Sequence, residues 1–203
     1  MFVLNTPVEL GTGITNLWVM AATLWWYLLL RKRGLSVTLL PFLGSFISSL
    51  LGFVVHTFVW STLYQNIMWV IILFALYSMV FSIVLNEIKY KYPKTANVLF
   101  EILPLLSIAT VLLNYMGDAG FKIAAAILFG GGVIYGSFSY LFNRKAYLPN
   151  ILLSAILLLI SSVLQVKYGD TVFSFGLNIH PIAHVIQAAS IFAYGLGCSQ
   201  RKS

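Results

Sequence analysis

Residues 67–85 read IMWVIILFALYSMVFSIVL, an apolar run that contains no charged side chain. An α-helix rises 1.5 Å per residue, so about 20 apolar residues cross the roughly 30 Å hydrocarbon core of a bilayer. The run is therefore long enough and apolar enough to span a membrane. It predicts a transmembrane helix.

The composition extends this prediction to the whole chain. Of its 203 residues 60% are hydrophobic and only 8% are charged, whereas a soluble domain is about 25% charged. Six further apolar runs cover residues 11–30, 35–59, 96–115, 122–142, 151–166 and 180–197. The connections are short and no second soluble domain is expected. The sequence predicts an all-α fold, an integral membrane bundle of seven transmembrane helices in one domain, residues 1–203.

The distribution of basic residues predicts the orientation of the bundle. With the N-terminus outside, ten basic residues fall on the cytoplasmic side: Arg31, Lys32, Arg33, Lys89, Lys91, Lys94, Arg144, Lys145, Arg201 and Lys202. Only Lys122 and Lys167 then fall outside. Cytoplasmic loops carry the excess of lysine and arginine in membrane proteins. We therefore expect an outside N-terminus and a cytoplasmic C-terminus, in the cell membrane or, in a eukaryote, an endomembrane.

Several protein classes and sites are excluded. The formal net charge of +7 comes from residues that flank the spans, so nucleic acid is not an expected partner. Cys198 is the only cysteine, which excludes an intramolecular disulfide and a cysteine-based metal site. The last apolar run has no lysine for a retinal Schiff base. The first lacks the basic n-region of a signal peptide, and we expect it to act as an uncleaved insertion signal.

Polar residues within the runs form stripes at helical spacing. In membrane proteins such residues usually point into the helix bundle, away from lipid. The stripes therefore predict the helix faces that pack against other helices. Most of the serines, threonines and glycines are interpreted as packing contacts, and Gly130-Gly131-Gly132 as a close approach or a kink. We expect the first helix to lie beside the second and seventh, so that Asn16, Ser49, His56 and His184 border one cavity.

The chain has three histidines, and the predicted topology brings them to one membrane depth. His56 lies late in the second helix, while His180 and His184 lie four residues apart at the start of the seventh. Residues four apart project from one helix face, and two such imidazoles with a third ligand form a common zinc site. We predict that the three histidines bind zinc. The structural alternative is that they cap a helix and form hydrogen bonds across the bundle.

This pattern resembles the CREST superfamily of seven-transmembrane hydrolases, which includes alkaline ceramidases and adiponectin-receptor-type proteins. The matching residues are His56 and the segment His180-Pro181-Ile182-Ala183-His184. The resemblance implies a seven-helix fold, a zinc cofactor on these histidines, and hydrolysis of a lipid amide or ester. Membrane lipids are then the expected partners and substrates.

The sequence departs from the CREST pattern at two positions. The family has a serine four residues before the histidine of the second helix, where this chain has Gly52. It also has an aspartate near the start of the third helix, where this chain offers Gln65 and Asn66. Ser49 lies on the same face as His56 and is predicted to replace the serine. Ser49 and Asn16 are the predicted catalytic residues, and one or the other is expected to assist the oxyanion.

The chain has few acidic residues that could take part in a site. Glu9 is expected just outside the first helix as an exposed loop carboxylate, with an approach to the histidines as the alternative, and Glu101 is expected within the fourth helix. Two other functions stay open beside the hydrolase. One is a non-catalytic receptor or assembly protein with structural or proton-sensing histidines, and the other is a small-solute transporter or proton relay. Neither the substrate nor the oligomeric state follows from the sequence.

Overall fold

The computed structural model describes residues 3–33, 39–116, 121–142, 148–168 and 179–200. Seven helices make up almost all of these residues: α1 (Pro7–Arg31), α2 (Leu40–Thr57), α3 (Thr62–Lys91), α4 (Pro93–Met116), α5 (Phe121–Phe142), α6 (Leu148–Tyr168) and α7 (His180–Ser199). Residues 34–38, 117–120, 143–147 and 169–178 lie outside the described residues. They include parts of the predicted connections at 31–34, 116–121, 143–150 and 167–179, and the start of the predicted second span at 35–38.

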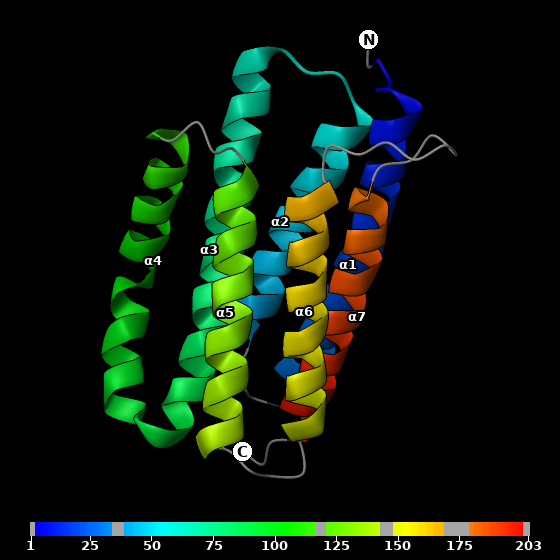
Figure 1. Ribbon diagram of the computed structural model, residues 1–203. Helices are drawn as coiled ribbons and strands as arrows, with labels where there is room; N and C mark the ends of the chain where they lie inside the picture. The colour runs from blue at the N-terminus through cyan, green and yellow to red at the C-terminus, as the bar shows by residue number, and fades with distance from the viewer. Residues whose placement is uncertain (1–2, 34–38, 117–120, 143–147, 169–178, 201–203) are drawn as a thin grey trace.

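Each of the seven helices is long and apolar enough to cross a membrane. Their lipid-compatible surface is broad, because large apolar side chains such as Trp18, Trp25 and Leu113 are exposed. In water such a surface would be unusual, but in a bilayer it faces hydrocarbon. The first helix begins and the last helix ends at opposite ends of the bundle (Figure 1). The all-α, seven-helix prediction is confirmed for these residues, and the chain has the features of a multi-pass membrane protein.

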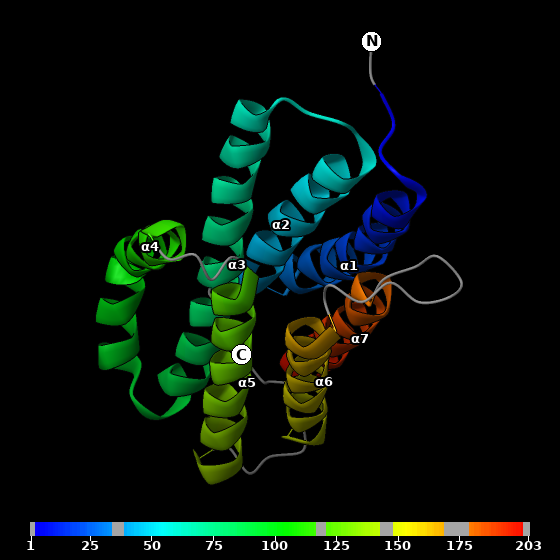
Figure 2. The same cartoon turned by 45° about the horizontal axis from the view of Figure 1, so that its top comes forward.

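Six helices form a closed ring. Following the contacts between neighbours, α1 packs on α2, α2 on α3, α3 on α5, α5 on α6, α6 on α7, and α7 on α1. The fourth helix stands outside this ring against α3, at the edge of the bundle in both views (Figures 1 and 2). The expected position of the first helix between the second and seventh is therefore confirmed.

Both predicted ends of the third helix were wrong. Residues 62–66 and 86–91 were expected in loops, yet the first belong to the start of α3 and the second to its end. At the far end the helix continues because its polar side chains have partners inside the bundle. Asn86 donates a hydrogen bond to the Tyr194 hydroxyl at 3.3 Å, and Glu87 accepts one from Ser139 at 2.5 Å. Only Tyr92 separates α3 from Pro93, the first residue of α4.

The start of α1 also differs from the prediction, and this change bears on the histidines. Glu9 was expected outside the helix but lies in its first turn. Thr6 caps the helix, because its side chain accepts a hydrogen bond from the Glu9 amide at 3.4 Å. Pro7 follows the cap in the first helical turn, where a missing amide hydrogen costs nothing. The helix therefore begins before the apolar run does.

Candidate functional site

A cavity of about 270 Å³ lies inside the six-helix ring. Every helix of the ring contributes to its wall and α4 contributes nothing. Along α2 its lining extends from Pro41 to His56, which at 1.5 Å per residue is roughly 20 Å. All three histidines line it, together with Asn16 and Ser49. The expectation that Asn16, Ser49, His56 and His184 border one cavity is confirmed.

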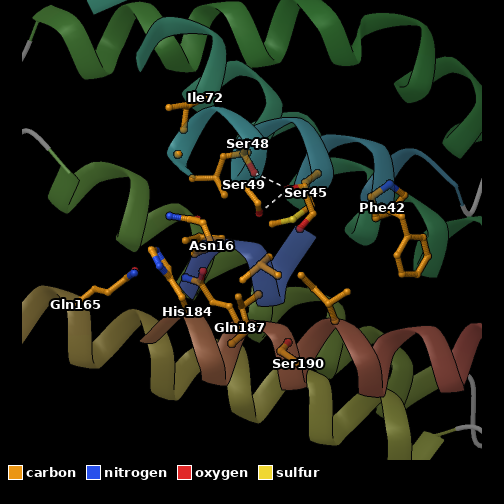
Figure 3. A pocket seen from close by; sticks show the side chains of 18 of the residues that line it. Asn16, Phe42, Ser45, Ser48, Ser49, Ile72, Gln165, His184, Gln187 and Ser190 are labelled. Carbon is orange, nitrogen blue, oxygen red and sulfur yellow. Dashed lines mark hydrogen bonds between the residues drawn. The ribbon is translucent and has the colours of Figure 1, made fainter. Parts of the chain in front are cut away.

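The polar groups gather where α1 begins, α2 ends and α7 begins, which we call the histidine end of the cavity. Figure 3 shows Asn16, Ser49, His184 and Gln187 turned toward the same space from three helices. Away from this end most of the wall is apolar, with Leu76, Met79, Ile83, Leu128 and Phe42 among its residues. It also carries the hydroxyl groups of Ser45, Ser48, Tyr135, Ser154, Ser190 and Tyr194. The cavity therefore has its histidines at one end and a mostly apolar wall, with scattered hydroxyl groups, along the rest of its length.

Glu9 and His56 form the closest polar contact at the histidine end. Oε2 of Glu9 lies 2.5 Å from Nδ1 of His56. The backbone holds their helices in register, since the Asn5 amide donates to the Thr57 carbonyl at 3.0 Å and the Val59 amide to the Val3 carbonyl at 2.9 Å. A carboxylate on Nδ1 orients the ring and leaves Nε2 as the nitrogen that can bind a ligand.

The other two histidines come from the first turns of α7. Nδ1 of His184 lies 3.2 Å from the Thr15 hydroxyl of α1, so this ring is also positioned by a neighbouring helix. His180 is the first residue of α7 and interacts electrostatically with Glu9. Pro181 follows it in the first turn and starts the helix. Glu9 therefore contacts the histidine of α2 and interacts electrostatically with the first histidine of α7.

The donor set has the chemistry of a zinc site, but not its closed geometry. Imidazole nitrogens are ordinary zinc ligands, and a carboxylate behind one of them is the usual second contact. Among the residues that the structure describes, no three His, Cys, Asp or Glu side chains are close enough together to hold one ion. The three rings line one cavity and would have to turn toward a common point to share a metal.

Asn16 occupies the space next to Gly52. A Cβ atom placed on Gly52 would lie 3.1 Å from Oδ1 and 3.2 Å from Nδ2 of Asn16. The amide of Asn16 donates to the Thr12 carbonyl at 3.1 Å, and only 6% of the residue is exposed. The missing side chain at position 52 thus lets a carboxamide from α1 lie against α2. This carboxamide borders the cavity beside the histidines.

Ser49 is buried and its hydroxyl is already engaged. It donates to the Ser45 carbonyl of its own helix at 2.7 Å, and Ser48 donates to the same carbonyl at 3.0 Å (Figure 3). In this arrangement the Ser49 oxygen can still accept a hydrogen bond, but its proton points to backbone. The catalytic roles predicted for Ser49 and Asn16 stay predictions.

Two further residues at the histidine end were not predicted as site residues. Trp69 of α3 packs edge-on against His56, with ring centroids 5.8 Å apart. Gln165 of α6 is 5% exposed, lines the cavity, and has an Oε1 atom without a hydrogen-bond partner among the described residues. The helical spacing of Ser154, Ser161 and Gln165 places Gln165 on an inward face. Spacing alone does not show whether such a side chain finds a partner.

Glu101, the acidic residue expected within the fourth helix, lies exposed on α4, outside the ring that encloses the cavity. It therefore cannot contribute to the histidine end within this chain.

Comparison with curated proteins and with solved structures gives no match. One family model matches residues 12–203, which include the whole cavity wall. The chain therefore belongs to DUF6962, a family of unknown function.

Proposed function

We propose that this protein is a membrane-embedded hydrolase that acts on a lipid amide or ester at the histidine end of the cavity. The observation that carries the proposal is the combination of a polar, histidine-lined end with a long apolar wall in one cavity. An acyl lipid has the same division, with a polar carbonyl group at one end and a hydrocarbon chain behind it. Pockets that bind such ligands are mostly apolar with a few polar groups that fix orientation.

In the proposal, His56, His180 and His184 hold a zinc ion after their rings turn inward. Bound zinc lowers the pKa of its water to about 7 and so supplies hydroxide at neutral pH. Glu9 orients the His56 ring through Nδ1. The apolar wall excludes water from the chain of the lipid and presents its carbonyl to the histidine end.

The proposed relation to the CREST superfamily rests on the positions of the three histidines and on the seven-helix bundle. The space next to Gly52, where that family has a serine, is taken here by the Asn16 carboxamide. We assign Asn16 the role of a donor to the developing oxyanion, because a carboxamide can supply the N–H that an oxyanion needs. Ser49, one turn earlier on α2, is the second candidate donor once its hydroxyl rotates away from Ser45.

The test is metal analysis combined with lipid turnover on the full chain in detergent. We expect one zinc per chain by mass spectrometry and release of fatty acid from an acyl lipid panel. His184→Ala should lose the zinc and the release of fatty acid. Asn97→Ala, which replaces an exposed polar residue on α4, should retain both. Protein without stoichiometric metal, and unchanged by replacement of all three histidines with alanine, would refute the proposal.

A non-catalytic binding or receptor protein is the second candidate. Two observations favour it: the three histidines are not gathered around one point, and the Ser49 proton is engaged with backbone. This candidate predicts that acyl lipids bind and stabilise the protein without being cleaved. Thermal stabilisation by a lipid that is recovered intact after incubation distinguishes it from the hydrolase.

We also propose the orientation with the start of α1 outside and the end of α7 in the cytoplasm. Its support is the excess of ten lysines and arginines over two, counted in the complete sequence. The histidine end would then face the outside or the lumen.

A further inference from the structure

Gln165 differs from the other polar residues on the inward face of α6. The Ser161 hydroxyl donates to the Ala183 carbonyl at 3.1 Å, and the Ser162 hydroxyl to the Leu158 carbonyl at 2.8 Å. The Ser154 hydroxyl lies 2.9 Å from that of Tyr135 and 3.1 Å from that of Ser190. Each of these serines has a protein partner. In the described part of the chain, Oε1 of Gln165 has none.

The side chain of Gln165 is placed to meet a ligand. It projects from α6 toward His184 at the histidine end of the cavity, with its amide nitrogen at the tip that faces His184 (Figure 3). It is 5% exposed, so bulk water does not solvate it. Buried acceptors without a donor are rare in native proteins and call for an explanation. A ligand in the cavity that brings its own N–H or O–H group supplies the missing donor.

We propose that Gln165 makes the site select ligands with a hydrogen-bond donor next to their carbonyl group, so that acyl amides bind in preference to acyl esters. The proposal rests on the proposed function only in taking an acyl lipid as the ligand. An amide N–H can donate to Oε1 of Gln165 while the carbonyl faces the histidines. An ester has an oxygen in place of the N–H and leaves Oε1 without a donor.

The terminal torsion of glutamine is soft, so the carboxamide can turn to present Oε1 to the ligand. A hydrogen bond to a buried acceptor that otherwise has none corresponds to a difference of about tenfold in affinity. Selectivity of this kind arises because a polar group of the site stays unpaired with the wrong ligand. The wild-type protein should therefore prefer the amide by about tenfold or more.

The experiment compares two ligands that differ only in NH against O and carry no other hydrogen-bond donor: N-ethylpalmitamide and ethyl palmitate. Binding to the full chain in detergent is measured at low temperature, and mass spectrometry checks that the ligands are recovered intact. Gln165→Met, which keeps the length of the side chain, should weaken amide binding about tenfold and leave ester binding nearly unchanged. Gln165→Glu keeps an acceptor and should retain the preference. Gln65→Met, an exposed position on α3, is the matched control.

Equal affinity for the two ligands in the wild type, no binding of either, or an unchanged preference in folded Gln165→Met would overturn the inference. If Gln165→Met fails to fold, the inference is tested by the ratio of amide to ester affinity in the wild type and in Gln165→Glu. The outcomes separate this inference from the proposed function. An amide preference without any turnover refutes the hydrolase and supports the role of Gln165. If both ligands are hydrolysed and bind with equal affinity, the hydrolase is supported and the role of Gln165 is refuted.

Discussion

The carboxylate of Glu9 meets the imidazole of His56 at 2.5 Å, across 47 positions of sequence. The contact joins the first turn of α1 to the last turn of α2 at the rim of the cavity. A pairing of extended backbone between Leu4 and Phe58 lies just beyond it. A carboxylate held in this way controls which nitrogen of the ring is available to a ligand.

Replacement of Glu9 by glutamine should impair the site without disturbing the bundle. The Glu9→Gln variant keeps the size of the side chain but loses the negative charge that orients and polarises His56. Loss of such a second contact typically costs 10–100-fold in metal affinity or activity. We expect a reduction of that order in zinc affinity and lipid turnover. Glu101→Gln is the matched control, because Glu101 is exposed on α4; an equal loss in both variants would contradict the role of Glu9.

Metal occupancy should fall as the medium becomes more acidic. Protons compete with a metal for imidazole nitrogens, so lower pH favours the metal-free protein. Free imidazole side chains become protonated near pH 6.5, and the loss should be steep because three rings are proposed to share one ion. Zinc retained after dialysis at a series of pH values measures it. Occupancy that stays constant down to pH 4 would exclude a site made of histidines.

How far the sequence predicts the fold is clear from α3. Its apolar run at 67–85 is sufficient to predict a span, because length and hydropathy decide membrane insertion. Its true ends at Thr62 and Lys91 could not be read in the same way. From the sequence alone, Asn86 and Glu87 are typical loop residues. In the structure each forms a hydrogen bond inside the bundle, Asn86 with Tyr194 and Glu87 with Ser139. Tertiary partners, and not local polarity, determine where this helix ends.

The site was predictable to a similar degree. Topology and helical spacing were enough to bring His56 and His184 to one cavity. The same reasoning could not predict that Glu9 lies within α1 and touches His56, since this depends on a cap at Thr6 and on one side-chain conformation. Nor could it predict that Oε1 of Gln165 has no hydrogen-bond partner in the described part of the chain. Periodicity predicts which face a residue occupies, while partners depend on neighbouring helices.

Removal of the Ser139 hydroxyl should destabilise the bundle. This hydroxyl donates to the carboxylate of Glu87, which is fully buried between α3 and α5. Loss of a hydrogen bond to a buried group costs about 1–3 kcal/mol. Ser139→Ala should therefore lower the thermal midpoint measured by intrinsic fluorescence in detergent. Ser137→Ala, two residues away and exposed, should change little, and equal stability of the two variants would count against a structural role for the contact.

The proposed orientation can be tested with single cysteines in a Cys198→Ser background. Thr62 and Lys94 are both exposed. Thr62 begins α3 at one end of the bundle, and Lys94 lies in the first turn of α4 at the other end. A membrane-impermeant maleimide added to intact cells should label Thr62→Cys and leave Lys94→Cys unlabelled until the membrane is opened. The reverse pattern would invert the bundle and place the histidine end in the cytoplasm.

The contact between Gly52 and Asn16 predicts an energetic coupling between α1 and α2. A Cβ atom at position 52 would lie 3.1 Å from the Asn16 carboxamide, closer than ordinary van der Waals contact. Gly52→Ala should therefore displace Asn16 and cost about 1–3 kcal/mol, as overpacking generally does. In an Asn16→Ala background the added methyl group has room, and the cost should shrink by about 1 kcal/mol.

Gly130→Ala is the control for this cycle, because a Cβ atom at Gly130 meets no atom of the described residues within 4 Å. It should be neutral or stabilising by up to about 1 kcal/mol, since alanine is the better helix former. Additive effects of Gly52→Ala and Asn16→Ala on the thermal midpoint would show that the two residues do not interact. A measured coupling would show that the two residues pack against each other. If Gly52→Ala also reduces lipid turnover or lipid binding, the position of Asn16 matters for the proposed function.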